Sequence, residues 1–219
     1  MLIKPNSKVK GTQLAGWKPD PMPKRIYDDI LLDHNVEVPM PDGTILRADT
    51  YRPRTKDKVP ALIGWAPYPK DIGNARISDP AGVVAYIAER GYGHVYVQNR
   101  GSGRSTGTRY GVFAPEEIDD LYRAIEWVAS QPWCDGNVGM IGVSYLGLSQ
   151  FHAAAKHPPA LKAISPYAAP TDAFREATKN GAVSNEFGTL FMSVTSLRLN
   201  LGPPVIRHIL SHVLPYIVY

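Results

Sequence analysis

The residue whose type and spacing could do chemistry is Ser144, which stands where the sequence pattern changes. An apolar stretch, residues 138–141, precedes it, and a helical pattern begins at Leu146. Gly142 and Gly147 flank the serine, two residues before it and three residues after it. A serine at such a strand-to-helix turn lies beside a helix N-terminus, where backbone N–H groups favour negative charge. The pattern therefore permits nucleophilic attack by Ser144. An ordinary turn with a surface serine is the alternative.

The elements that must position this serine alternate between strand and helix patterns. Residues 116–130 carry apolar side chains at three- and four-residue steps after Pro115, which predicts a helix. Further helices are expected over residues 81–89 and 145–156. Strands are expected over residues 61–65, 93–98, 138–141 and 161–164, with a hairpin of residues 31–38 and 44–51 around Asp42-Gly43. This order predicts an α/β fold: a mostly parallel sheet with flanking helices and an N-terminal antiparallel hairpin.

Composition restricts the class of protein. The chain has 219 residues, 44% hydrophobic and 20% charged, with a net charge of +4, as in a globular domain. Its single cysteine, Cys134, excludes an internal disulfide. No secretory signal and no uninterrupted apolar run long enough to span a membrane is recognisable, so we expect a cytoplasmic protein without a membrane partner. The sequence suggests no metal or organic cofactor.

Several segments, in order, resemble the cocaine esterase and X-prolyl dipeptidyl aminopeptidase-like serine hydrolases (the CocE/NonD group). These segments are Met40-Pro41-Asp42-Gly43-Thr44, Leu46-Arg47-Ala48-Asp49, Pro67-Tyr68-Pro69-Lys70, residues 100–107, Glu126-Trp127, residues 131–139 and Gly142-Val143-Ser144-Tyr145-Leu146-Gly147. The resemblance implies an α/β-hydrolase fold, and the elbow pattern of that group, G-x-S-Y-x-G, accommodates Leu146 where the general G-x-S-x-G pattern has glycine. It also implies hydrolysis of a small ester or an X-Pro peptide amide.

The same resemblance implies a role for three residues. Ser144 matches the nucleophile, Tyr68 matches a tyrosine whose hydroxyl donates to the oxyanion, and the backbone N–H of Tyr145 matches the second donor. Two fixed donors suit a tetrahedral intermediate that carries a full negative charge on oxygen. Without the resemblance, Tyr68 would be interpreted as an aromatic residue at the edge of the core.

The segment after the expected strand 93–98 departs from the pattern of the group. Gln98 stands where an aspartate is usual, and the loss of a carboxylate–arginine contact would loosen the following loop. That loop, Gly101–Gly107 with Arg100 and Arg104, also suggests a phosphate or nucleic-acid binder together with the basic N-terminal residues. No Gly-Lys-Ser/Thr follows, so we interpret the segment as a structural loop and expect no nucleic-acid partner.

A serine nucleophile needs a histidine base and a carboxylate, which follow it in this order in α/β-hydrolases. We expect three regions: a basic extended arm over residues 1–30, a partial hydrolase core over residues 31–171, and the start of a helical cap with an apolar tail over residues 172–219. In this interpretation the fold is incomplete at its C-terminal side and the triad Asp and His are absent from the chain. An internal triad of Asp172 with His208 or His212 is the alternative.

Two further expectations follow from an incomplete core. A catalytically inactive fragment is an alternative to an active hydrolase, and ester turnover by this chain alone is expected to be near zero. Missing strands would expose a sheet edge, through which self-association is possible.

Overall fold

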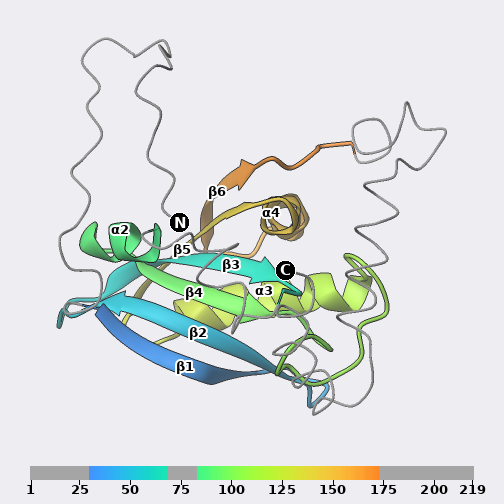
Figure 1. Ribbon diagram of the computed structural model, residues 1–219, viewed down its shortest axis with the longest axis horizontal. Helices are drawn as coiled ribbons and strands as arrows, with labels where there is room; N and C mark the ends of the chain where they lie inside the picture. The colour runs from blue at the N-terminus through green and yellow to red at the C-terminus, as the bar shows by residue number, and fades with distance from the viewer. Residues whose placement is uncertain (1–29, 69–82, 173–219) are drawn as a thin grey trace, which may run out of the picture.

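The computed structural model describes residues 30–68 and 83–172, which form the sheet and the helices drawn in colour in Figure 1. The strands are β1 (Ile30–Pro39), β2 (Ile45–Pro53), β3 (Val59–Ala66), β4 (Gly93–Gln98), β5 (Cys134–Val143) and β6 (Leu161–Tyr167). The helices within these residues are α2 (Val83–Glu89), α3 (Pro115–Ala129) and α4 (Tyr145–Lys156). The expected arm and cap lie outside the described residues, apart from Ile30 and Asp172.

The sheet has the strand order β1-β2-β4-β3-β5-β6 (Figure 1). β1 pairs antiparallel with β2, and β2 pairs antiparallel with β4. The pairs β3–β4, β3–β5 and β5–β6 are parallel. The predicted α/β fold with a leading hairpin is therefore confirmed. The carboxyl ends of β3, β4, β5 and β6 meet at one edge of the sheet, which is where open α/β sheets place their ligands.

The core lies between the centre of the sheet and α3. Ile63 and Trp65 of β3 and Leu121 and Ile125 of α3 are fully buried. α3 packs against β3 and β5, and α4 packs against β3, β5 and β6 and touches α3. Each buried side chain of this size contributes about 1.5–3 kcal/mol to folding. This packing fixes α3 and the first turn of α4 against the end of the sheet.

Several strands extend beyond their predicted ranges, and β5 does so most at its start. β5 begins at Cys134, four residues before the expected start at Val138. Cys134 pairs with Val59 and Val138 pairs with Ala61, so the residues between them form a bulge in the ladder. Gly136 has a φ of 91°, which allows this local turn at little steric cost. Periodicity missed the paired residue because the bulge interrupts the alternation.

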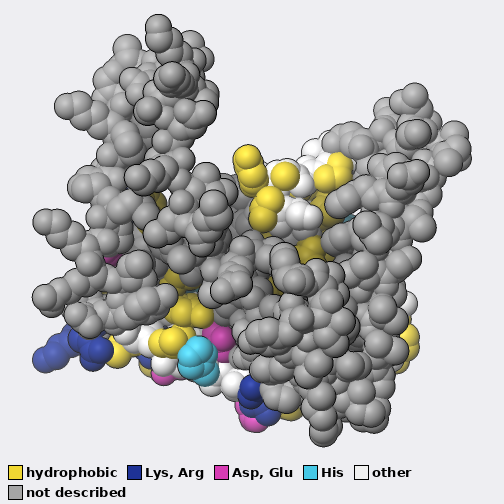
Figure 2. All heavy atoms as spheres, in the orientation of Figure 1, with side chains coloured by type: hydrophobic (Ala, Val, Ile, Leu, Met, Phe, Trp, Pro, Cys, Tyr) yellow, Lys and Arg dark blue, Asp and Glu magenta, His cyan; other side chains and the backbone are white. Residues whose placement is uncertain are grey.

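β6 forms one edge of the described sheet, and its side chains are mostly half-buried or exposed. Tyr167 at its end is 73% exposed. Figure 2 shows hydrophobic side chains at the surface where Figure 1 places β6 and the residues after it. Among the described residues β6 has only one partner strand, β5, and an unpaired strand edge can pair with another chain. Self-association through this edge stays a prediction.

Candidate active site

Ser144 lies at the tip of the turn between β5 and α4. Its φ of 59° and ψ of −118° are costly for a residue with a Cβ, and its side chain makes no capping hydrogen bond. Its backbone is held on both sides: its N–H donates to the Tyr167 carbonyl at 3.0 Å, and its carbonyl accepts from the N–H of Leu148 at 2.8 Å. The residue is exposed to solvent. The turn therefore presents the hydroxyl outward on a rigid, strained backbone.

The positions of the neighbouring glycines follow from close packing. Gly142 has a φ of 153°, and a Cβ there would lie 2.3 Å from the Cβ of Leu146. A Cβ at Gly147 would lie 2.9 Å from the Tyr167 carbonyl oxygen. Leu146 itself is 4% exposed and belongs to the core. This elbow therefore needs glycine at 147 and an apolar side chain at 146, which explains the departure from G-x-S-x-G.

Tyr68 lies just beyond the end of β3 and faces the serine. Its ring meets the Tyr145 ring edge-on, with centroids 6.1 Å apart and planes at 70°. Burial raises the pKa of the Tyr68 phenol, while a hydrogen bond with Ser144 and the charge of Arg109 oppose the rise. The Tyr68 hydroxyl and the Ser144 side chain therefore lie within hydrogen-bonding reach of each other. Their roles in one catalytic site stay a prediction.

Tyr145 turns its side chain away from solvent, while its backbone begins α4. The phenol donates to Glu117 Oε1 at 2.5 Å and accepts from Arg109 Nη2 at 3.2 Å. Burial raises the pKa of this phenol well above its ordinary value. Phe113 stacks on the ring with centroids 4.4 Å apart. As the first helical residue, Tyr145 has no intrahelical acceptor for its backbone N–H, which leaves that donor beside the Ser144 turn.

A buried polar network around Glu117 holds the Tyr145 side chain next to the elbow, and the sequence did not reveal it. Glu117 of α3 is 1% exposed, and its Oε1 accepts from Tyr145, from Asn99 Nδ2 at 2.5 Å and from Trp65 Nε1 at 3.3 Å. Its Oε2 lies 3.7 Å from Arg109 Nε. Burial raises the pKa of the Glu117 carboxyl, while the hydrogen bond from Tyr145 and the charge of Arg109 oppose the rise.

One signal in the sequence could have revealed Glu117. It stands four residues before Leu121, on the same apolar face of α3. A carboxylate on a buried helical face needs a partner, because an unpaired buried charge is costly. Arg109 offers no such signal, since it lies in a loop without periodicity.

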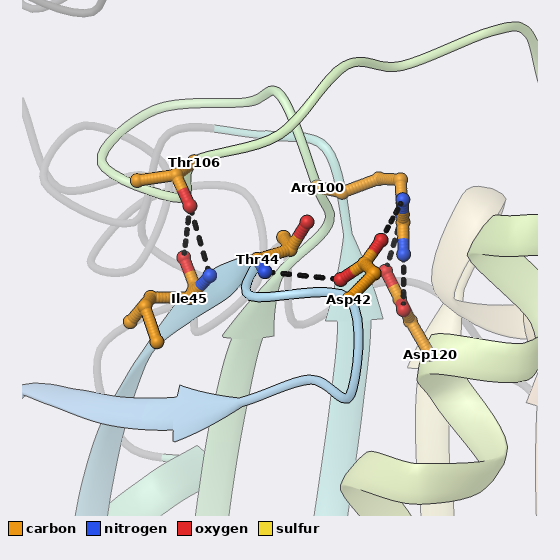
Figure 3. A network of polar contacts seen from close by, with 6 residues as sticks. All are labelled: Asp42, Thr44, Ile45, Arg100, Thr106 and Asp120. Carbon is orange, nitrogen blue, oxygen red and sulfur yellow. Dashed lines mark hydrogen bonds and ion pairs between the residues drawn. The ribbon is translucent and has the colours of Figure 1, made fainter.

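The loop after β4 is fastened by Arg100, contrary to the expectation that Gln98 would loosen it. Arg100 donates from Nε and Nη2 to the two oxygens of Asp120 at 2.6 Å each, and from Nη1 to Asp42 at 3.0 Å. Figure 3 shows the arginine between the turn that follows β1 and the side of α3. These bonds raise the pKa of Arg100 above its ordinary value despite burial. Since Arg100 has two carboxylate partners, the missing aspartate at 98 does not leave it unpaired.

The same loop is also tied to β2. The Thr106 hydroxyl accepts from the Ile45 N–H at 2.8 Å and donates to the Ile45 carbonyl, and Asp42 accepts from the Thr44 N–H (Figure 3). Because the donors of Arg100 are engaged with protein carboxylates, Arg100 is not available to cradle a phosphate. The interpretation of this segment as a structural loop therefore fits its contacts.

No hydrogen bond joins Ser144 to a histidine within the described residues. His94 is the second residue of β4, at the opposite end of the parallel strands, and is 5% exposed. His152 stacks on Phe113 with centroids 4.5 Å apart, and His157 ends α4 in a left-handed conformation. His208 and His212 lie outside the described residues, so their pairing with Asp172 stays a hypothesis. Over residues 30–68 and 83–172 there is no cluster of three potential metal ligands.

The family follows from a match of residues 42–204 to the X-Pro dipeptidyl-peptidase (S15) family, a region that includes Tyr68 and Ser144. The chain belongs to this hydrolase family. A cocaine esterase from Rhodococcus sp. (strain MB1 Bresler) is 40% identical over 143 residues, which make up 64% of this chain and 24% of that protein. A Xaa-Pro dipeptidyl-peptidase from Lactobacillus delbrueckii subsp. bulgaricus is 28% identical over 154 residues, 64% of this chain and 19% of that protein.

A solved structure of the same group supports the fold. A CocE/NonD family hydrolase from Staphylococcus aureus superposes with a TM-score of 0.71 at 27% identity, covering 80% of this chain and 34% of that one. The resemblance to the CocE/NonD group and the α/β-hydrolase fold are therefore confirmed. The chain spans about a quarter or less of the curated relatives named here. Within the described residues, no helix has the length and apolar character that crossing a membrane requires.

Proposed function

We propose that this chain carries the nucleophile and the oxyanion hole of a serine hydrolase that transfers an acyl group from an ester or an X-Pro amide to water. The observation that carries the proposal is the exposed, strained Ser144 with the Tyr68 phenol in hydrogen-bond contact with it. Membership of the S15 family and the relatives with esterase and dipeptidyl-peptidase names support the reaction class.

In the proposed reaction the Ser144 oxygen forms a bond to the substrate carbonyl carbon, and the carbonyl π electrons move to oxygen. The Tyr68 hydroxyl and the Tyr145 N–H donate to this oxyanion. Collapse of the intermediate expels the alcohol or amine and leaves an acyl-serine, which water then hydrolyses by the same route. Each oxyanion donor typically lowers the barrier by about 2.7–4 kcal/mol.

The environment of Tyr68 suits a hydrogen-bond donor. A raised phenol pKa keeps the hydroxyl protonated at neutral pH, so the group can donate to a developing negative charge. Tyr145 contributes through its backbone, and its own phenol is engaged with Glu117. We therefore assign the two tyrosines different roles: one donates through its side chain, the other through its peptide group.

We further propose that the histidine base and its carboxylate lie outside the described residues. The Ser144 proton must leave as the new bond forms, and no described histidine forms a hydrogen bond with the hydroxyl. Without a base, turnover falls by about 10⁴–10⁶-fold. An added base such as imidazole can accept this proton in place of a histidine side chain.

The test uses a fluorophosphonate probe on the full chain, with and without imidazole, and peptide mapping by mass spectrometry. We expect a single phosphonylated residue, Ser144, whose modification disappears in Ser144→Ala. Ser130→Ala removes an exposed serine at the end of α3 and is the matched control, which should keep the adduct. Modification of another residue, or an unmodified Ser144 at high probe and imidazole concentration, would overturn the proposal.

Two assays, run side by side, identify the substrate class. Turnover of p-nitrophenyl esters and of X-Pro p-nitroanilides, measured side by side with imidazole present, distinguishes an esterase from a peptidase. Both substrates require Ser144 in this proposal. The expected division into residues 1–30, 31–171 and 172–219 and the cytoplasmic location stay predictions.

A further inference from the structure

Gln98, the last residue of β4, is a buried amide whose two ends both find partners. It is 1% exposed. Its Nε2 donates to the Tyr68 carbonyl at 3.2 Å, and its Oε1 accepts from the Arg104 N–H at 3.3 Å. One side chain therefore joins the segment after β3 to the loop after β4.

The Tyr68 carbonyl depends on side chains for its hydrogen bonds. β3 ends at Ala66, whose carbonyl accepts from the Asn99 N–H at 3.2 Å. Two residues later, the Tyr68 carbonyl accepts from Gln98 Nε2 and from the Tyr96 hydroxyl, each at 3.2 Å. Both donors come from β4, the strand next to β3. These two bonds anchor the backbone of the residue whose phenol reaches Ser144.

The loop after β4 packs directly on the Gln98 amide. Gly103 has a φ of 51°, and a Cβ there would lie 2.1 Å from Gln98 Nε2. The Ser105 hydroxyl donates to the Gln98 carbonyl at 2.8 Å, which holds the loop and β4 together. The amide thus cannot rotate away from Tyr68 without disturbing the glycine loop.

The chemistry of this site requires an amide. The group at position 98 must donate toward Tyr68 and accept from Arg104 at the same time. An amide does both, whereas an ionised carboxylate only accepts. The aspartate that the resemblance led us to expect would place an acceptor against the Tyr68 carbonyl and would reach less far.

We infer that Gln98 is a positioning residue that orients Tyr68 for oxyanion stabilisation, an inference that rests on the proposed function. Its amide transmits the position of the Gly103–Ser105 loop to the backbone of Tyr68. In this chain the glutamine therefore positions Tyr68, and its presence does not represent the loss of a contact.

The test compares two isosteric substitutions in protein labelled with ¹³C at the tyrosine ζ carbons. Gln98→Glu keeps the acceptor and removes the donor, and we expect it to shift the Tyr68 signal, assigned with Tyr68→Phe. Gln131→Glu is the matched control: Gln131 also donates from Nε2 to a backbone carbonyl, that of Trp127 at 2.8 Å, but it lies just before β5 begins and does not bond to the elbow. Its substitution should leave the Tyr68 signal in place.

A second readout is the rate of Ser144 phosphonylation with imidazole present. Gln98→Glu should lower the maximal rate about tenfold, the effect of a misplaced donor that acts in the transition state, and leave the half-saturating probe concentration unchanged. If wild-type Ser144 is never modified, the proposed function fails, while the Tyr68 signal still tests Gln98. An unshifted Tyr68 signal in folded Gln98→Glu would overturn the inference.

A measurement on the wild type covers the case in which Gln98→Glu does not fold. The Gln98 Nε2 protons should exchange slowly with D₂O, because the amide is buried and bonded to Tyr68. Exchange as fast as that of an exposed glutamine amide would equally overturn the inference.

Discussion

Glu117 and Asp120 are two carboxylates on one helix, three residues apart and both buried, yet they have different surroundings. Asp120 binds one guanidinium through both oxygens at 2.6 Å. Glu117 gathers three neutral donors on Oε1, and its cation, Arg109, lies 3.7 Å from Oε2. Burial raises the pKa of both carboxyls. At Asp120 the rise is opposed mainly by the hydrogen bonds from Arg100, and at Glu117 mainly by the hydrogen bond from the Tyr145 hydroxyl.

The two carboxylates therefore have different roles: Asp120 supports the fold, and Glu117 supports the candidate site. Asp120 holds Arg100, which fastens the turn after β1 and the loop after β4. Glu117 holds Tyr145, the residue next to the nucleophile. When one partner of a buried ion pair is removed, the other charge stays buried without compensation, which strongly destabilises the fold. A carboxylate surrounded by neutral donors can lose its charge and keep most of its geometry.

The largest expected effect is that of Asp120→Asn. The new amide would turn N–H groups toward the buried Arg100, and we expect a loss of about 3 kcal/mol in the free energy of unfolding. Urea denaturation at pH 7, followed by circular dichroism, measures this loss. Asp119→Ala is the control, since Asp119 pairs with exposed Lys156 and should cost less than about 1 kcal/mol. Equal losses in the two variants would contradict the role of the buried pair.

Tyr145→Phe should cost about 2 kcal/mol, because it removes a hydrogen bond to a buried carboxylate. Urea denaturation again gives the value. The substitution keeps the backbone N–H, so the site of phosphonylation should stay at Ser144. A variant as stable as the wild type would show that the Glu117–Tyr145 bond does not support the elbow.

His94 supplies a comparison at the opposite end of the parallel strands, where burial alone shifts the pKa of a titratable group. Burial lowers its pKa from 6.5 to about 4. The unfolded chain therefore binds more protons between these values, and stability present above pH 6.5 is lost as pH falls toward 4. We expect a loss of about 2 kcal/mol between pH 7 and pH 5 from this residue.

The measurement for His94 is urea denaturation of the wild type and of His94→Leu at both pH values. The difference in stability between pH 7 and pH 5 should shrink by that amount in the variant. If both proteins lose the same stability on acidification, His94 is not the group responsible.

Glu117→Gln should have the smallest effect, about 1 kcal/mol at pH 7, because glutamine still accepts from Tyr145. The pH dependence has a definite sign. The folded pKa of Glu117 is raised, so its contribution is full below the unfolded value of 4.5 and falls as pH rises through the folded value. The advantage of the wild type over Glu117→Gln should therefore be larger at pH 4.5 than at pH 7. A larger loss than in Asp120→Asn would reverse the comparison.

The sequence predicted the order of the elements well, because local periodicity determines it. Residues 116–130 carry the apolar stripe of α3, and the alternation of strands and helices implied parallel pairing. The bulge at residues 135–137 was not predictable from local sequence, because it is defined by the pairing of Cys134 with Val59 and of Val138 with Ala61, residues far away in the chain. The Ser144 turn was identified from its flanking glycines, which the close approach of Leu146 and Tyr167 requires.

The supporting contacts of the site were harder to predict, since they join residues far apart in the chain. Arg109, Glu117 and Tyr145 meet only after α3 has packed beside α4. Gln98 was interpreted as a lost contact, because a resemblance compares residue types and not the partners that this chain supplies. Its bond to the Tyr68 carbonyl depends on the packing of β3 against β4.

The most direct test of the account is the rate of Ser144 phosphonylation in Tyr68→Phe relative to the wild type, with imidazole as the base. Tyr110→Phe, which alters a tyrosine that is 71% exposed, is the control. Loss of one oxyanion donor predicts a rate about 10²–10³-fold lower in Tyr68→Phe and an unchanged rate in Tyr110→Phe. Equal rates in Tyr68→Phe and the wild type would contradict the assignment of Tyr68 and, with it, of the oxyanion hole.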